Sequence, residues 1–225
     1  MSDAVNPTEN KFAREILGIT TSKNHLNIYD NLELDKVRIK LAKYDLQNKL
    51  AYEEAYAFVS TSEIRVLAQM VSFGGKRFSQ VFPYTPGSKT ETGYLRMKGS
   101  TVKGNPPRVE SRIMQLTYAE SVTKDGKTEK RRQPYFMKIS NGPGAIIGKG
   151  IVQPNGSPTA NVIMSFGEFQ LMEILTTVNA YIERFLLVKT SLKERERVKA
   201  IVTAELAKEA NEATARMNNA RSPQA

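Results

Sequence analysis

The chain has 225 residues, a formal net charge of +10 and no cysteine. The length allows one large domain or two small ones, and the lack of cysteine excludes disulfides and thiolate metal sites. No apolar run approaches the roughly 20 residues of a membrane-spanning helix, and the polar start MSDAVNPTENKF has no signal-peptide core. We therefore expect a cytoplasmic protein with no membrane partner, located in the host cytoplasm if the chain is viral.

The first 22 residues are predicted to form an arm, in which KFAREILGI (residues 11–19) makes a helical turn that ends near Gly18. NHLNIYD, KVRIKLAKYD and AYEEAYAFVS are predicted to be strands. The second of these alternates, with Val37, Ile39 and Leu41 on one face and Lys36, Arg38 and Lys40 on the other. Such alternation is typical of a half-buried antiparallel strand with its apolar side inward.

One motif occurs twice in the chain. Ala55–Met70 aligns with Ala160–Leu175, with identities at Ala55/Ala160, Ser60/Ser165 and Glu63/Glu168 and apolar residues exchanged at most other positions. In each copy a predicted strand runs into Ser-x-x-Glu, which is the pattern of a helix capping box. The two copies indicate a repeated strand-to-helix junction. Chance similarity between two amphipathic junctions is the alternative.

The middle of the chain carries the net charge, since residues 76–160 hold 15 Lys and Arg against 5 Asp and Glu. Its predicted strands are TGYLRMKGS, VESRIMQLTYAES, QPYFMKIS, GAIIGKGIV and TANVIMS, and KDGK is predicted to be a hairpin turn. From Ser191 the chain is predicted to form a long helix with an apolar stripe of Val198, Ile201, Val202 and Leu206. A concentrated basic segment favours a polyanion partner, usually nucleic acid.

These elements predict an α+β fold of two repeated units, each an antiparallel four-stranded sheet plus a helix, followed by a long C-terminal helix. The predicted parts are an arm (1–22), one domain (23–190) with repeats at about 23–75 and 90–190, a C-terminal helix (191–218) and a disordered tail (219–225). This element order and the doubled junction resemble the Whirly family and the related positive-cofactor-four-like and kinetoplastid guide-RNA-binding proteins, over roughly residues 24–190. The lysine-glycine-lysine-alanine motif of plant Whirly proteins is absent. The resemblance implies binding of single-stranded nucleic acid on the sheets and a homo-oligomer formed through helices.

Catalysis has little support in the sequence. His25 is the only histidine and cysteine is absent, so a His/Cys metal cluster cannot form. A serine triad would have to use His25. Glu53 and Glu54 are adjacent on a predicted strand and would point to opposite faces. NGPGAIIGKG lacks the spacing and the hydroxyl residue of a phosphate-binding loop. We expect no enzyme activity, no metal and no cofactor.

Basic and aromatic residues share faces of the predicted strands. In TGYLRMK, for example, Tyr94, Arg96 and Lys98 lie on one face. Cations follow the phosphates of single-stranded nucleic acid, and aromatic rings stack on its unpaired bases. The residues predicted to contact phosphates are Lys36, Arg38, Lys40, Arg77, Arg96, Lys98, Lys103, Arg131, Arg132, Lys138 and Lys149. Those predicted to stack on bases are Phe78, Tyr94, Tyr135 and Phe136.

The sequence therefore predicts a single-stranded DNA-binding protein with little sequence preference, in a phage or prokaryotic replication or recombination system. RNA binding or annealing by the same surface is one alternative. A structural or virion protein with a basic surface is another.

Overall fold

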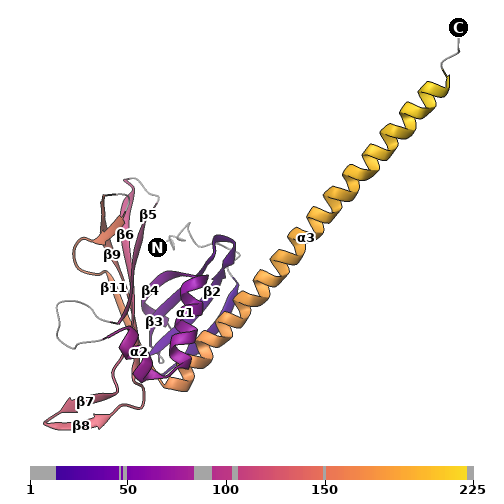
Figure 1. The fold of residues 1–225 in the computed structure, drawn as a ribbon. Coiled ribbons are helices and arrows are strands. Elements are labelled where there is room, and N and C mark those ends of the chain that lie inside the picture. The colour runs from indigo at the N-terminus through magenta and orange to yellow at the C-terminus, as the bar shows by residue number, and fades with distance from the viewer. Residues whose placement is uncertain are drawn as a thin grey trace. The chain divides into compact units, whose positions relative to one another are not determined.

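The computed structural model describes residues 14–45, 47, 50–83, 93–102, 106–148 and 151–221. Met1–Tyr181 and Ile182–Ala225 form two compact units. Figure 1 shows the elements of the described residues. In chain order they are β1 (Glu15–Thr20), β2 (Asn24–Asn31), the 3-10 helix η1 (Leu32–Leu34), β3 (Lys36–Asp45), β4 (Leu50–Ser60), α1 (Thr61–Ser72), α2 (Gly75–Val81), β5 (Tyr94–Val102), β6 (Arg108–Tyr118), β7 (Ser121–Lys124), β8 (Lys127–Lys130), β9 (Tyr135–Ile147), β10 (Ile151–Pro154), β11 (Ala160–Phe166) and α3 (Glu168–Arg221).

The first sheet is an antiparallel meander with strand order β1-β2-β3-β4. Val37, Ile39 and Leu41 on β3 are fully buried, as the alternation predicts. The predicted helical turn near Gly18 is wrong, because Glu15–Thr20 forms β1 and pairs with β2. Leu17 and Ile19 lie opposite Ile28 and Leu26 in that pairing, so apolar packing across the sheet outweighs the local helical pattern.

The second sheet is also antiparallel and is built around the long strand β9. β5, β6 and β9 are neighbours in that order, and the free side of β9 pairs with β11 near its start and with β10 near its end. β7 and β8 form a separate hairpin. The predicted KDGK turn is confirmed, since Asp125 (φ 50°) and Gly126 (φ 77°) take the left-handed conformations that a tight hairpin turn requires. The structure therefore contains antiparallel sheets and a long C-terminal helix, in an α+β fold.

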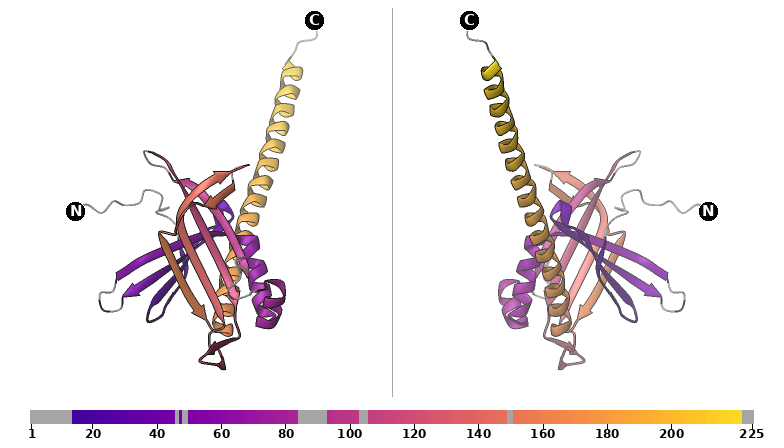
Figure 2. Two further views of the ribbon diagram at one scale, coloured as in Figure 1. Left: turned by 90° about the vertical axis from the view of Figure 1, so that its left-hand side faces the viewer. Right: turned by 90° about the vertical axis from the view of Figure 1, so that its right-hand side faces the viewer.

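The edge strand β4 joins the first sheet to the second. The side chain of Asn141 on β9 accepts from the Tyr56 N–H at 2.7 Å and donates to the Tyr56 carbonyl oxygen at 2.8 Å. Glu53 on β4 accepts from the Asn161 N–H of β11 at 2.6 Å. Figure 2 shows the two sheets crossing, not lying face to face. The two faces of the first sheet consequently have different neighbours.

Helices cover the aliphatic face of the first sheet. α1 packs beside β4 and α2, and the Tyr181 hydroxyl of α3 donates to Asp30 of β2 at 2.9 Å (Figure 1). Their buried residues are Ile64, Leu67, Ala68 and Val71 on α1 and Leu171, Ile174, Leu175 and Val178 on α3. These side chains and the aliphatic residues of both sheets form the core.

One of the two predicted capping boxes is present. Ser60 caps α1 as predicted, with the Ser60 hydroxyl accepting from the Glu63 N–H and the Glu63 carboxylate accepting from the Ser60 N–H. The Ser165–Glu168 box is wrong, because Ser165 lies inside β11 and α3 begins at Glu168. The Glu168 carboxylate instead accepts from the Gly75 N–H at 3.0 Å, at the start of α2. It therefore satisfies a free amide of a different helix.

This difference predicts unequal effects of two serine substitutions. Ser60→Ala removes a side-chain cap and should lower the free energy of unfolding by about 1 kcal/mol. Ser165→Ala removes only a hydrogen bond to Gln133 from a partly exposed position and should change it by less than about 0.5 kcal/mol. Urea denaturation followed by circular dichroism measures both. Equal losses would show that Ser60 does not act as a cap.

The C-terminal region is a single helix. α3 runs without a break from Glu168 to Arg221, so the prediction of a separate helix from Ser191 is wrong. Residues 219–221 of the predicted disordered tail are helical, and 222–225 lie outside the described residues, as do residues 1–13 of the predicted arm. No helix in the described part of the chain is both long enough and apolar enough to cross a membrane.

Candidate nucleic-acid interface

The face of the first sheet that points away from the helices carries rings and cations. Tyr29, Arg38 and Phe58 lie opposite one another on β2, β3 and β4, and Asn27, Lys40 and Tyr56 form the neighbouring row. Directly paired residues lie on the same side of a sheet. Because Ile39 and Ala57 between these rows are buried in the core, the rows belong to the opposite face.

The cations on this face are held over rings or at its edge. The Arg38 guanidinium lies 4.6 Å from the centroid of the Tyr29 ring. Lys40 pairs with Glu54 at 2.7 Å, whereas Lys36 is exposed at the end of β3. An arginine over a ring keeps its charge and is held in place by the ring's electrons.

Arg112 on β6 joins the second sheet to this face. Its guanidinium donates to the Tyr56 hydroxyl at 2.8 Å and to the Ser100 hydroxyl at 2.7 Å, and it pairs with Glu110. It lies 4.6 Å from the centroid of the Tyr56 ring and 5.7 Å from that of Phe58. These contacts fix the guanidinium and order the ring beside it before any ligand binds.

Arg96 on β5 is committed to a structural contact as well. It is 9% exposed and forms an ion pair with Glu63 in the first turn of α1. Burial lowers the pKa of Arg96 from its ordinary value, but a guanidinium stays protonated at neutral pH. Arg96 therefore contributes positive charge while its direct contact is with protein.

Between these elements lies a cavity of about 290 Å³. Its walls are Asn31, Leu34, Lys36, Ala57, Phe58, Arg96, Lys98, Gly99, Ser100 and Arg112. We call this cavity and the adjoining sheet face the cationic cleft. Its rings and cations are Tyr29, Lys36, Arg38, Lys40, Tyr56, Phe58, Arg96, Lys98 and Arg112.

The cationic cleft has donors and charges that the described residues do not satisfy. Among the described residues, neither Lys36 nor Lys98 has an ion-pair or hydrogen-bond partner. The Nε atoms of Arg38, Arg96 and Arg112 are buried without a partner in the described chain. Buried donors without protein partners normally meet water or a ligand. The arrangement can hold an anionic, ring-containing chain such as an unpaired nucleic-acid strand.

Five of the residues predicted from sequence come together in the cationic cleft: Lys36, Arg38, Lys40, Arg96 and Lys98. Four of the rings and cations of the cationic cleft were not predicted from sequence: Tyr29, Tyr56, Phe58 and Arg112. The alternation of AYEEAYAFVS carried the signal for Tyr56 and Phe58, since they alternate with Ala55, Ala57 and Val59, which are buried. Arg112 has no comparable signal, because its position depends on how the two sheets cross.

Two predicted stacking residues lie in the core, and their prediction is wrong. Phe78 and Tyr135 are each 0% exposed, and their ring centroids are 5.5 Å apart. Neither ring presents a face to a base. Tyr94 is half-buried with its ring edge-on to Phe82, and burial raises the pKa of Tyr94 to about 12. These rings stabilise the packing around α2.

The other predicted residues lie away from the cationic cleft. Arg77 is exposed on α2 and hydrogen-bonds Gln80 at 3.2 Å. Lys103 and Lys149 lie outside the described residues. Arg131 and Arg132 follow the β7–β8 hairpin, and Phe136 and Lys138 on β9 pair with Thr117 and Gln115 on β6. This last pair occupies the opposite face of the second sheet from Arg112, which pairs with Asn141.

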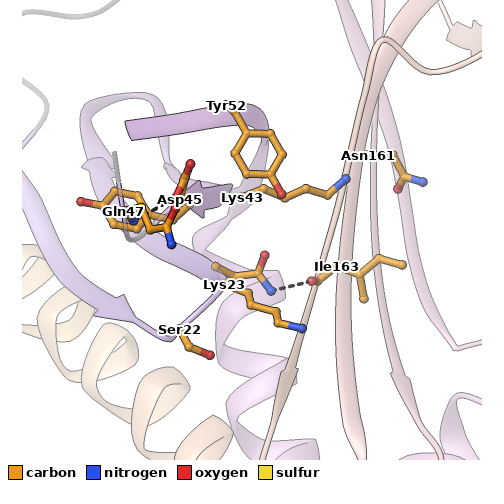
Figure 3. Close-up of a pocket in the computed structure, with 10 residues that line it drawn as sticks. Ser22, Lys23, Lys43, Asp45, Gln47, Tyr52, Asn161 and Ile163 are labelled. Atoms are coloured by element: carbon orange, nitrogen blue, oxygen red, sulfur yellow. Dashed lines mark hydrogen bonds between the residues drawn. The ribbon is translucent and has the colours of Figure 1, made fainter. Parts of the chain in front are cut away.

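A second pocket, of about 870 Å³, lies beside β11, where β2 and β4 begin and β3 ends (Figure 3). It is lined by Ser22, Lys23, Asn24, Lys43, Tyr44, Asp45, Gln47, Tyr52, Asn161 and Ile163. The Asn24 side chain donates to the Ile163 carbonyl oxygen at 3.1 Å, and Lys43 pairs with Glu53. The Tyr52 residue is 68% exposed. This pocket offers a ring and an amine from the first sheet beside the edge of the second.

Within the described residues, no group of three or more His, Asp or Glu side chains is placed to hold a metal ion. A comparison with models of known protein families finds none that matches this chain, and a comparison with curated proteins finds no match.

Proposed function

We propose that this chain binds single-stranded DNA in the cationic cleft, with little sequence preference and without enzymatic activity. One observation carries the proposal: Tyr29, Tyr56 and Phe58 share a sheet face with Arg38 and Lys40. Lys36 and Lys98, which have no partner among the described residues, flank that face. Rings stack on any unpaired base, and lysines follow any phosphate chain, so such a site has no means of reading sequence. A role in phage or prokaryotic replication or recombination is consistent with this activity.

The spacing of buried residues in the two sheet-plus-helix units supports the proposed link to the Whirly-like proteins. Two buried residues of β4, Ala57 and Val59, align with the buried Val162 and Met164 of β11 at an offset of 105 residues. The buried apolar residues of α1 align with buried residues of α3 at an offset of 107 residues, as in Ile64 with Leu171. We infer that the two sheet-plus-helix units are diverged copies, with two additional residues between strand and helix in the second.

RNA would use the same contacts, because the cationic cleft has no feature that addresses the 2′-hydroxyl. Competition between matched DNA and RNA strands decides between the two ligands.

Removing the two unpaired lysines tests the proposal. Lys36→Ala combined with Lys98→Ala should reduce the slope of log affinity against log salt by about 1.4, since each phosphate contact on a single strand contributes about 0.7. Fluorescence anisotropy of a labelled single strand at several salt concentrations measures the slope. The control is Lys76→Ala combined with Lys199→Ala, two exposed lysines outside the cationic cleft. An unchanged slope in the first variant would place the strand elsewhere.

We also propose that the chain forms a homo-oligomer through α3, with a second copy as the partner. Leu187, Val188, Leu192, Val198, Ile201 and Val202 are each about half exposed or more. Lys193 to Arg197 alternate in sign, so the glutamates of one copy can lie beside basic residues of the other.

Val198→Glu combined with Val202→Glu should lower the molar mass measured by light scattering, because two carboxylates would be buried in the contact. Ala200→Glu adds a charge at another position around the helix and should leave the mass unchanged. A mass that does not respond to the double variant would exclude this helix as the contact.

A further inference from the structure

The cavity in the cationic cleft is lined by cations that lie next to one another on the second sheet. Lys98 on β5 is directly opposite Arg112 on β6, so their side chains are neighbours on one face. Arg96 is two residues before Lys98 on β5 and shares that face. The Arg112 guanidinium lies 5.7 Å from the centroid of the Phe58 ring, which also lines the cavity. Three cations and one ring therefore border the same space.

The first sheet and α1 border the cavity on its other side. Lys36 on β3 pairs with Ser60 on β4, and the Ser60 hydroxyl donates to the Glu63 carboxylate at 2.5 Å. Glu63 in turn forms an ion pair with Arg96 of β5. Contacts therefore run without a break from β3 through α1 to the second sheet, and the cavity is a single site.

The charges around the cavity leave an excess of two positive charges. Arg96 and Arg112 are 9% and 8% exposed, and each is paired with the carboxylate of one glutamate. Lys36 and Lys98 also line the cavity, without an ion-pair partner in the described part of the chain. A phosphodiester within a strand carries one negative charge, whereas a terminal phosphate monoester carries about two at neutral pH. The excess therefore matches the end of a strand better than its interior.

The size of the cavity also favours a strand end. Its volume of about 290 Å³ lies at the lower limit of small-molecule sites, which span about 300–1,000 Å³. Such a space can take about one nucleotide, with the Phe58 ring available to its base. The next nucleotides would lie along the adjoining sheet face, where Tyr29, Arg38 and Tyr56 are outside the lining of the cavity.

We propose that the cavity binds the phosphorylated end of a DNA strand, with the terminal phosphate held by Lys36, Lys98 and Arg112. Arg96 adds positive charge beside it, and Phe58 stacks on the terminal base. The proposal rests on the proposed function, because the rest of the strand would lie on the cationic cleft. A phosphate monoester is common to 5′- and 3′-phosphorylated ends. Since cleavage of a phosphodiester bond leaves a monoester on one of the two new ends, this site would direct the chain to cut strands.

Three single strands of one sequence test the proposal. Each is about 12 nucleotides long and labelled on an internal base, with a 5′-phosphate, a 3′-phosphate or hydroxyl groups at both ends. Fluorescence anisotropy with the full chain should show one phosphorylated strand bound at least about tenfold more tightly than the hydroxyl strand, because hydrogen bonds to a charged group are strong. The preferred strand identifies the end that the cavity holds.

Two lysine variants locate the phosphate. Lys98→Ala should reduce this preference to less than about threefold, because it removes a cation of the cavity. Lys40→Ala is the control, since Lys40 lies on the same sheet face as Tyr56 but does not line the cavity. It should weaken all three strands equally and preserve the preference. Circular dichroism confirms that both variants are folded.

A mononucleotide gives a reading that does not depend on the rest of the strand. Deoxyadenosine monophosphate should raise the midpoint of thermal unfolding, and deoxyadenosine, which lacks the phosphate, should not.

The outcomes separate this inference from the proposed function. Equal affinity for the three strands would overturn the inference and leave binding in the cationic cleft in place. A preference that Lys98→Ala does not reduce would also overturn it, because the phosphate would then lie elsewhere. Stabilisation by the monophosphate without binding of any strand would overturn the proposed function alone. Absence of both effects would overturn both proposals.

Discussion

Replacing Phe58 with alanine should weaken the binding of single-stranded DNA by about 5- to 150-fold while leaving its salt dependence unchanged. The ring is half-buried on the face of β4 that it shares with Tyr56, and the centroids of the two rings are 5.8 Å apart. Stacking on one base contributes about 1–3 kcal/mol, and removing a ring removes no phosphate contact. Anisotropy titrations at several salt concentrations measure both quantities.

Two further variants control for indirect effects of this substitution. Phe58→Tyr keeps the aromatic face and should bind with nearly normal affinity. Phe169→Ala removes a ring that is 81% exposed on α3, outside the cationic cleft, and should have no effect. If Phe58→Ala and Phe58→Tyr bind equally well, Phe58 does not stack on a base.

Gly75→Ala should produce a large loss of stability, about 2–3 kcal/mol. A Cβ atom at this position would lie 2.0 Å from Cε2 of Tyr118, far inside van der Waals contact. Tyr118 cannot simply move away, since its ring lies 5.0 Å from the buried Tyr135 ring. The midpoint of thermal unfolding should fall by roughly 5–10 °C in a chain of this size.

Gly148→Ala is the matched control for this prediction. A Cβ atom there would have no heavy atom within 4 Å, so the unfolding midpoint should stay within about 2 °C of the wild type. Similar midpoints for the two variants would mean that α2 is not packed against Tyr118 as the structure has it.

The strands were largely predictable because their signal is local. Alternation of apolar and charged residues in KVRIKLAKYD identified β3 and its buried face, and KDGK identified the tight turn between β7 and β8. The Ser60–Glu63 box was predictable for the same reason, since a cap depends on residues three apart. The same pattern at Ser165 gave a wrong prediction, because the Glu168 carboxylate instead accepts a hydrogen bond from the Gly75 N–H of α2.

The candidate site was predictable only in part, because its geometry comes from the crossing of two sheets. Phe78 and Tyr135 have the composition of stacking residues, but they are buried where α2 packs on the second sheet. The sequence places Lys98 and Phe136 in one predicted set of binding residues, but pairing in the sheet places them on opposite faces. No local sequence pattern predicts the hydrogen bond from Arg112 to Tyr56, because the two residues are 56 positions apart in the chain.

The most direct test of the account compares single-stranded and duplex DNA of the same sequence. A labelled strand of about 30 nucleotides, alone or annealed to its complement, is titrated by fluorescence anisotropy at low and moderate salt. The account predicts at least about tenfold tighter binding of the single strand, weakening as salt rises, because only unpaired bases can stack on Tyr29, Tyr56 and Phe58. Equal affinity for strand and duplex, or no binding at moderate salt, would contradict it.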